Sequence, residues 1–157
     1  MIMTYQIDIE SNSQSTQIPA LGELERWISA ALQSQKFKEA EVSVYIVDES
    51  EGQELNSQYR GKDYPTNVLS FPADIAEEVG IPLLGDLVVC APVVEREAQE
   101  QDKTLQAHWA HMLVHGTLHL VGFDHIDDDE AEVMETLETQ IVTGLGYPAP
   151  YQDFTEE

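Results

Sequence analysis

The alternation of apolar and polar residues divides this chain into a series of strands and helices. Strict alternation or a short β-branched run indicates a strand, whereas apolar residues recurring every three to four positions indicate an amphipathic helix. The pattern predicts four strands, at residues 3–9, 41–48, 67–71 and 85–91. It predicts five helices, over about residues 19–35, 48–59, 92–101, 104–121 and 127–143.

These elements predict an α+β fold in which helices pack on a small mixed four-stranded sheet. The strand over 85–91 is apolar almost throughout, so we expect it in the middle of that sheet. Nothing in the composition separates two domains, and residues 1–157 are interpreted as one domain. The acidic segment 73–82 is expected to form an exposed loop or a hairpin arm, and residues 152–157 a frayed tail.

Two of the predicted helices have clear burial patterns. The helix over 104–121 has apolar residues around its histidines, so we expect it to be largely buried. In the last helix, the residues assigned to the inner face are Val133, Met134, Leu137 and Ile141. Both helices are therefore expected to pack against the rest of the molecule.

The composition narrows the class of protein. The chain has 157 residues, 42% of them apolar, which suits a globular protein with a sizeable core. No apolar run approaches the ~20 residues needed to cross a bilayer, and the first residues do not have the pattern of a signal peptide. Cys90 is the only cysteine, so it is interpreted as a small core residue of a protein from the reducing cytoplasm.

The chain is strongly acidic, because acidic residues outnumber basic residues by 23. Such an excess repels nucleic acids and anionic membranes at long range. The chain has only seven basic residues, and two of them, Arg60 and Lys62, are two positions apart. A nucleic acid is therefore expected to bind only where such cations cluster.

All five histidines fall between positions 108 and 125. His115 and His119 are four residues apart and project from the same face of the predicted helix. Gly122 can end that helix in a left-handed conformation and let the chain bring His125 back towards the pair. Three converging imidazoles make a transition-metal site, with zinc as the first choice and a fourth position left for water or substrate.

The residues around this trio have alternative roles. His108 and His111 are assigned orienting or packing roles, because one helix cannot easily direct four imidazoles at one ion. Asp124 has two alternative roles. It could act at the metal, by orienting a ligand imidazole or activating a metal-bound water, or it could cap the turn before the last helix. Asp86 either hydrogen-bonds a ligand imidazole or belongs to a turn at the entry to its strand.

The spacing of the histidines is shared with a class of zinc peptidases. The metzincin pattern is H-E-x-x-H-x-x-G-x-x-H, and His115, His119, Gly122 and His125 occupy the matching positions. The residue after the first histidine is Gly116, where those peptidases have the glutamate that acts as general base. The sequence therefore keeps the metal ligands but lacks the base of a peptidase.

Three blocks of residues carry a closer resemblance. The first is His115-Gly-Thr-Leu-His119-Leu-Val-Gly122-Phe-Asp124-His125, which matches the pattern H-G-x-L-H-L-x-G-[YF]-D-H. The second contains Leu55-Asn56, Tyr59-Arg60-Gly61-Lys62-Asp63 and Pro65-Thr66-Asn67-Val68-Leu69-Ser70-Phe71-Pro72, and the third contains Leu84-Gly85-Asp86-Leu87 and Glu97-Ala98. The trailing residues Met134, Glu138 and Gly146-Tyr147-Pro148 also fit. In these blocks, over about residues 40–150, the chain resembles the YbeY family of bacterial endoribonucleases.

The resemblance implies a single-strand-specific endoribonuclease that acts in the maturation of the 3′ end of small-subunit (16S) rRNA and in ribosome quality control. It implies one zinc ion per chain, held by His115, His119 and His125, and it implies that Arg60 is needed for activity. It also implies single-stranded rRNA as the substrate, a ribosome or ribosomal protein as the partner and a cytoplasmic location, with no role at membranes or on DNA.

The residue types at the site suggest metal-assisted hydrolysis of a phosphodiester bond. Zinc lowers the pKa of its bound water to about 7, so hydroxide is available at neutral pH. The metal or Arg60 would neutralise charge on the phosphoryl oxygens, and Lys62 would supply a point charge to a neighbouring phosphate. The alternative for both cations is a surface turn, in which they offset acidic neighbours, and the family resemblance favours the functional role for Arg60. Two candidates remain for the general base, Asp124 and the zinc hydroxide itself.

Two other functions remain open from the sequence. One is a metal-stabilised, ribosome-associated assembly factor without catalysis, which would fit the negative charge and the missing acid–base residue. The other is a metalloprotease-like hydrolase that uses the same metal on a peptide or ester bond.

Overall fold

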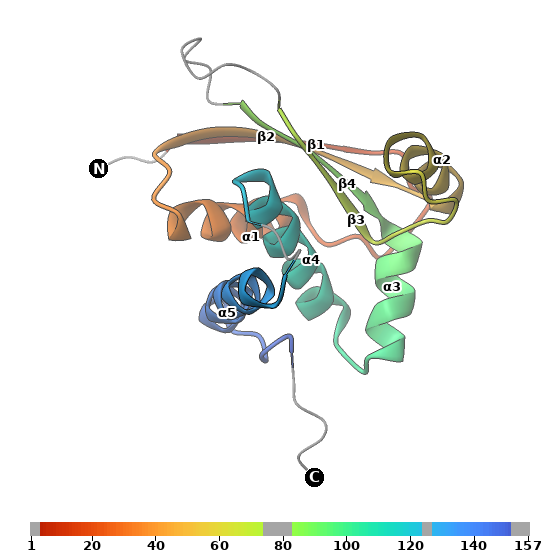
Figure 1. Ribbon diagram of the computed structural model, residues 1–157. Helices are drawn as coiled ribbons and strands as arrows, with labels where there is room; N and C mark the ends of the chain where they lie inside the picture. Colours follow the sequence, from red (N-terminus) through yellow and green to blue (C-terminus); the bar gives the residue numbers. More distant parts are fainter. Residues whose placement is uncertain (1–3, 74–82, 124–126, 152–157) are drawn as a thin grey trace.

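A mixed four-stranded sheet forms one layer of the molecule (Figure 1). The structure is a computed structural model in which residues 4–73, 83–123 and 127–151 are described. Within these residues the strands are β1 (Thr4–Ser11), β2 (Glu39–Val47), β3 (Val68–Pro72) and β4 (Leu83–Cys90). Their order is β1-β2-β4-β3, with β1, β2 and β4 parallel and β3 antiparallel to β4. The predicted mixed sheet, with the strand over 85–91 at an internal position, is confirmed.

Helices cover both faces of this sheet. The described residues contain α1 (Leu21–Ser34), α2 (Glu49–Arg60), α3 (Ala91–Glu100), α4 (Leu105–Leu120) and α5 (Asp128–Gly144). Figure 1 shows α1, α4 and α5 together on one side of the sheet, with α4 next to it and α5 farther out. The predicted α+β fold is confirmed, and each predicted helix and strand is present.

The alternation of side chains along β4 divides the apolar core between the two faces. Leu87 and Val89 are buried in the cluster that includes residues of α1 and α4. Val88 and Cys90 are buried on the other face, against Leu55 of α2. Burial raises the pKa of the Cys90 thiol to about 11, so this cysteine is an unreactive core residue, as predicted.

The same alternation places Asp86 away from the histidines. Asp86 and Val88 are two residues apart on β4, so their side chains project from the same face of the sheet. That face is covered by α2, and a groove there is lined by both residues together with Tyr59 and Phe71. The interpretation of Asp86 as a hydrogen-bond partner of a ligand imidazole is therefore wrong. The turn alternative is also wrong, because β4 begins three residues earlier, at Leu83.

The inner face of α5 differs from the prediction at one position. Met134 is buried, and Leu137 and Ile141 pack against the same cluster, as predicted. Val133 is 54% exposed, so its assignment to the inner face is wrong. Residues four positions apart share a helix face, and the buried residue one turn after Met134 is Glu138. A carboxylate therefore lies on the face that packs towards α4.

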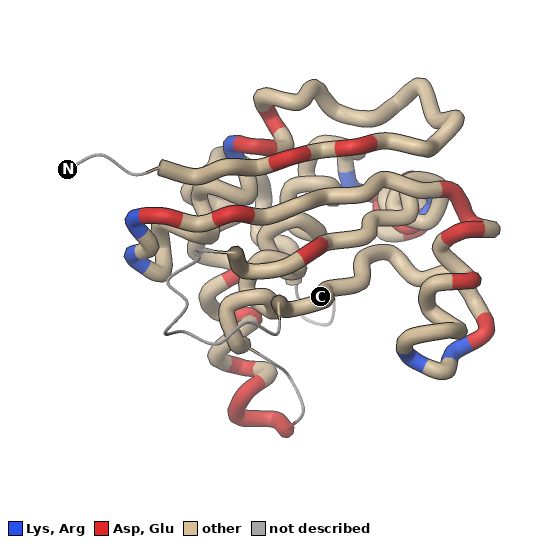
Figure 2. Tube along the Cα trace, turned by 90° about the horizontal axis from the view of Figure 1, so that it is seen from above, with Lys and Arg blue, Asp and Glu red and all other residues tan. Residues whose placement is uncertain are grey.

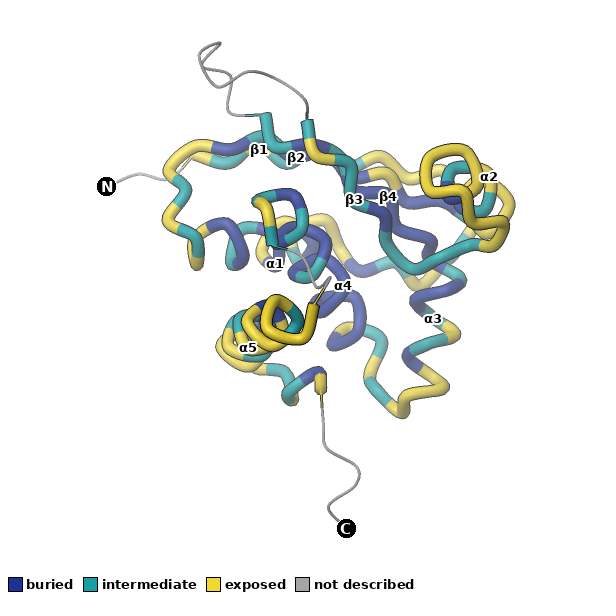
Figure 3. Tube along the Cα trace, viewed as in Figure 1, coloured by how far each residue is buried: buried dark blue, intermediate teal, exposed yellow. Residues whose placement is uncertain are grey.

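The histidine-bearing helix α4 is enclosed by the rest of the molecule, as predicted. Figure 3 shows it buried along most of its length, and Trp109 and Leu113 are fully buried. Residues 74–82 of the predicted acidic loop and the predicted tail 152–157 lie outside the described residues. In the part of the chain that is described, no helix combines the length and apolar character needed to span a bilayer.

Candidate metal centre

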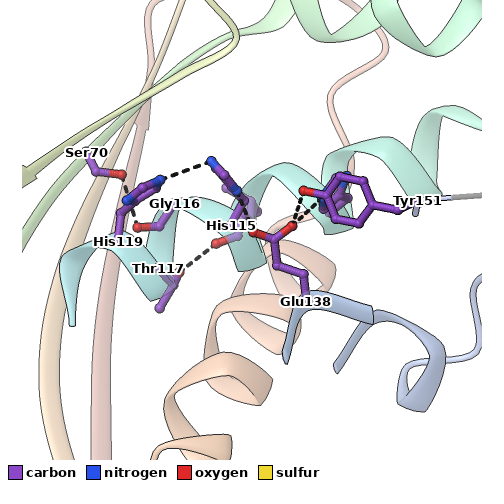
Figure 4. A network of polar contacts seen from close by, with 9 residues as sticks. Ser70, His115, Gly116, Thr117, His119, Glu138 and Tyr151 are labelled. Atoms are coloured by element: carbon purple, nitrogen blue, oxygen red, sulfur yellow. Dashed lines mark hydrogen bonds and ion pairs between the residues drawn. The ribbon is translucent and has the colours of Figure 1, made fainter. Parts of the chain in front are cut away.

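Gly116 allows α4 to lie directly against the sheet. A Cβ atom at this position would be 2.9 Å from Cδ2 of Leu87 and 3.1 Å from Cγ2 of Val68. The Ser70 hydroxyl donates a hydrogen bond of 3.0 Å to the Gly116 carbonyl oxygen, which attaches α4 to β3 (Figure 4). The position at which metzincins have their glutamate therefore faces the sheet in this fold. The fold leaves no room for a peptidase base there.

We expect Gly116→Glu to prevent stable folding rather than to create a peptidase. The new side chain would overpack the contact with the sheet and bury a carboxylate, at a cost of about 4 kcal/mol or more in the free energy of unfolding. Denaturant unfolding measures this loss, with Gly144→Glu as the control because Gly144 is exposed and has no atom within 4 Å of an added Cβ. A stable Gly116→Glu protein that cleaves peptides would contradict this interpretation.

His115 and His119 lie one turn apart on α4 and face each other. Their Nε2 atoms are 3.2 Å apart and their ring centroids are 4.6 Å apart (Figure 4). Two nitrogen ligands of one tetrahedral zinc ion, each about 2.05 Å from it, lie about 3.3 Å apart. The separation of the two nitrogen atoms therefore matches one edge of a zinc coordination sphere.

The helix carrying this pair ends as the sequence suggested. α4 ends at Leu120, and Gly122 has a φ of +108°, in the region that favours glycine. Residues 124–126, which include Asp124 and His125, lie outside the described residues. The roles of His125 as third ligand and Asp124 as catalytic residue therefore remain predictions.

A cleft of about 700 Å³ opens beside the histidine pair. His115 and His119 line it together with Arg60 and Lys62, so the structure brings together the predicted ligands and the predicted cations. The remaining lining residues are mostly polar or aromatic and include Asn67, Ser70, Tyr64 and Phe123. This combination suits an extended, negatively charged substrate better than an apolar one.

Arg60 is held at the wall of this cleft by two contacts. Its Nη2 atom donates a hydrogen bond of 2.6 Å to the carbonyl oxygen of Ser70. Its guanidinium carbon lies 5.5 Å from the centre of the Phe71 ring, within the range of a cation–π contact. Since Ser70 also bonds to Gly116, the arginine and the histidine helix are both attached to β3.

Glu138 of α5 completes the site, and sequence analysis gave it no role there. Its side chain is fully buried, its Oε2 is 2.6 Å from Nδ1 of His115, and its Oε1 is 2.8 Å from Nε2 of His111. The Tyr151 hydroxyl donates a further hydrogen bond of 2.5 Å to Oε1. Burial alone would raise the pKa of Glu138, but the hydrogen bonds from His111, His115 and Tyr151 outweigh it and lower the pKa to about 2. Glu138 is therefore an ionised carboxylate inside the protein.

His108 has a separate carboxylate partner. Its Nε2 atom is 2.9 Å from Oε1 of Glu97, which also accepts hydrogen bonds from the amide of Asn67. Burial favours the neutral form of Glu97, but the hydrogen bonds from His108 and Asn67 more than compensate and lower its pKa. This contact ties α4 to α3 and to the start of β3.

Side chains that could bind a metal lie on both sides of His115. Besides the pair with His119, the described residues contain a His–His–Glu group of His111, His115 and Glu138. The potential ligand atoms of this group lie within 4.8 Å of one another, which is close enough to hold a metal ion. The site therefore has the donor set of a metal centre, built on α4 and α5.

The cleft differs in charge from most of the molecule. In Figure 2 acidic residues are spread over most of the trace, whereas basic residues occur at few places. Two of the seven basic residues, Arg60 and Lys62, line the cleft beside the histidines. The cleft is thus a local exception to the acidic character of the chain.

The fold and this site define a metal-dependent hydrolase. The family model "Endoribonuclease YbeY" matches residues 6–146, which is most of the chain. The chain belongs to the YbeY family, and the resemblance found in its sequence motifs is confirmed.

Two known proteins illustrate this membership. The protein named endoribonuclease YbeY of Cellvibrio japonicus (strain Ueda107) is 68% identical over 149 residues, which cover 95% of this chain and 84% of the relative. The solution structure of TM1509 from Thermotoga maritima matches with a TM-score of 0.62 and 28% identity, covering 97% of this chain and all of that one. The similarity therefore extends over the whole fold.

Proposed function

We propose that this chain is a zinc-dependent, single-strand-specific endoribonuclease that matures the 3′ end of small-subunit (16S) rRNA and acts in ribosome quality control. The observation that carries the proposal is the 3.2 Å approach of the His115 and His119 Nε2 atoms at a cleft that also contains Arg60. Membership of the YbeY family and the name of the 68% identical relative support RNA as the substrate.

In this proposal one zinc ion is held by His115, His119 and His125. The first two already lie at a separation that suits one ion, and Gly122 lets the chain turn after α4. Three protein ligands leave a fourth position for water or substrate, as catalytic zinc sites require. His125 supplies the third imidazole, and Asp124 beside it is one of the two candidates for the general base.

The two cations of the cleft have distinct roles in the proposed reaction. Zinc, when bound, supplies a Lewis acid that favours ionisation of water near neutral pH. Arg60 binds the phosphoryl oxygens of the scissile phosphate and stabilises the charge that develops on them, because its planar fork matches phosphate geometry. Lys62 binds a neighbouring phosphate, so that the two cations orient the strand across the cleft.

The charge of the chain determines how it meets RNA. With an excess of 23 acidic residues, the isolated protein repels RNA at long range and attracts it only locally, at the two cations of the cleft. We therefore propose that a ribosomal particle or ribosomal protein presents the single-stranded segment in the cytoplasm. Neither a membrane nor DNA enters this proposal.

Cleavage of a matched pair of RNAs tests the proposal. We expect the zinc-loaded protein to cut a single-stranded RNA that spans the 3′ end of precursor 16S rRNA, and to cut the same segment at least tenfold more slowly when it is annealed to its complement. A chelator should stop the reaction and added zinc should restore it. Equal cleavage of both RNAs, or cleavage that continues in chelator, would contradict the proposal. Zinc binding without any cleavage would instead support the assembly-factor alternative.

A further inference from the structure

The carboxylate of Glu138 is the connection between the candidate metal ligands and the helix behind them. Glu138 belongs to α5, whereas both histidines that it contacts, His111 and His115, belong to α4. It is fully buried next to Met134, a turn earlier on the same helix. A buried carboxylate is costly unless its oxygens are hydrogen-bonded, so this placement depends on its partners.

Each carboxylate oxygen of Glu138 accepts at least one hydrogen bond. Oε2 accepts from Nδ1 of His115 at 2.6 Å, and hydrogen bonds to an ionised acceptor are short. Oε1 accepts from Nε2 of His111 and from the Tyr151 hydroxyl, at 2.8 and 2.5 Å (Figure 4). Three donors, two from α4 and one from the segment after α5, therefore fix the orientation of this carboxylate.

The contact with Nδ1 determines which nitrogen of His115 is available to a metal. An ionised carboxylate only accepts hydrogen bonds, so Nδ1 of His115 must carry the proton. The lone pair of the neutral ring is then on Nε2. That atom is the one that lies 3.2 Å from Nε2 of His119. Glu138 thus selects the tautomer of His115 that can bind an ion shared with His119.

The distances distinguish this role from direct coordination. Two ligand atoms of one tetrahedral zinc ion lie about 3.3 Å apart. The distances from Glu138 to His115 and to His111, 2.6 and 2.8 Å, are shorter than this and match hydrogen bonds. Of these three distances, the one between His115 and His119 has the length expected of two ligands on one ion.

We infer that Glu138 is a positioning residue, which holds His115 with its proton on Nδ1 and its Nε2 directed at the metal. This inference rests on the proposed metal site and adds a residue from α5 to it. His111 and Tyr151 act one step farther away, by holding Glu138 in place. The zinc affinity of the site then depends on a carboxylate that does not touch the ion.

The variant Glu138→Gln tests this role because it keeps the size of the side chain and removes its charge. We expect its zinc dissociation constant, measured in competition with a chromophoric chelator, to rise by about 10- to 100-fold. Glu135→Gln is the matched control, since Glu135 is exposed on the same helix and should leave zinc affinity unchanged. In the metal-free protein, ¹⁵N NMR of the histidine ring should show His115 protonated at Nδ1 in the wild type and in Glu135→Gln. In Glu138→Gln the same ring should be a mixture of tautomers.

Thermal unfolding of the metal-free proteins separates this role from simple support of the fold. A loss of zinc affinity together with the tautomer change, in a Glu138→Gln protein that remains folded, supports the inference even if no RNA is cleaved. If Glu138→Gln does not fold, the wild-type ¹⁵N spectrum decides, and a proton on Nε2 of His115 overturns the inference. Wild-type zinc affinity in Glu138→Gln overturns it while leaving the proposed nuclease intact. Failure of the wild-type protein to bind zinc overturns both.

Discussion

Replacing His119 by alanine is expected to remove both zinc binding and RNA cleavage. The free energy of zinc binding at sites of four protein ligands is about 10–16 kcal/mol. The loss of one ligand is therefore expected to cost about 3 kcal/mol, or a factor of at least 100 in zinc affinity. Cleavage should fall by about 1,000-fold or more, because the remaining ligands hold the ion poorly and in a different geometry. Metal content after dialysis and the rate of RNA cleavage measure the two effects.

The fold should survive this change because His119 borders the cleft and is only partly buried. Gln106→Ala is a suitable control, since Gln106 is an exposed residue near the start of the same helix. It should retain both zinc and activity. A His119→Ala protein that still holds one zinc ion per chain and cuts RNA at the wild-type rate would contradict the proposed ligand set.

Replacing Arg60 by alanine should abolish most of the cleavage while leaving the metal in place. Loss of a hydrogen-bond donor to the charge that develops in the transition state typically lowers kcat by about 100- to 1,000-fold. Zinc affinity should not change, because the described contacts of Arg60 are with Ser70 and Phe71 and not with the histidines. Single-turnover cleavage rates and zinc titrations measure these two quantities separately.

Two related variants make the test of Arg60 specific. Arg60→Lys keeps the charge but loses the planar fork, so it should recover only a small part of the activity. Lys62→Ala should mainly weaken RNA binding and raise KM, because it removes a point charge from a neighbouring phosphate. An Arg60→Ala protein with wild-type kcat would show that the arginine does not act on the scissile phosphate.

Local patterns in the sequence were enough to predict the fold and the His115–His119 pair of the site. Alternation and helical spacing are local properties, and they located the nine helices and strands of the described residues. The four-residue spacing of His115 and His119 is equally local, because the geometry of one helix fixes it. Val133 was predicted on the inner face of α5 but is exposed. The rotation of α5 about its axis depends on how it packs against α4, which local spacing does not show.

Glu138 could not be found in this way. It lies 23 residues after His115, on another helix, and only the packing of α5 against α4 brings the two together. The available signal was its position one turn after Met134 in an apolar stripe, where a carboxylate must have hydrogen-bonding partners. The role of Gly116 was equally hidden, because the sequence shows that a base is missing but not that the position faces β3 and β4.

A crystal structure of the zinc-loaded protein, with the ion located by its anomalous scattering, tests the proposed metal centre most directly. We expect one ion bonded to the Nε2 atoms of His115 and His119 and to the imidazole of His125, with its fourth position open to the cleft beside Arg60. Glu138 should remain hydrogen-bonded to Nδ1 of His115. An ion bonded to His111 and Glu138, or one enclosed by four protein ligands, would contradict this arrangement.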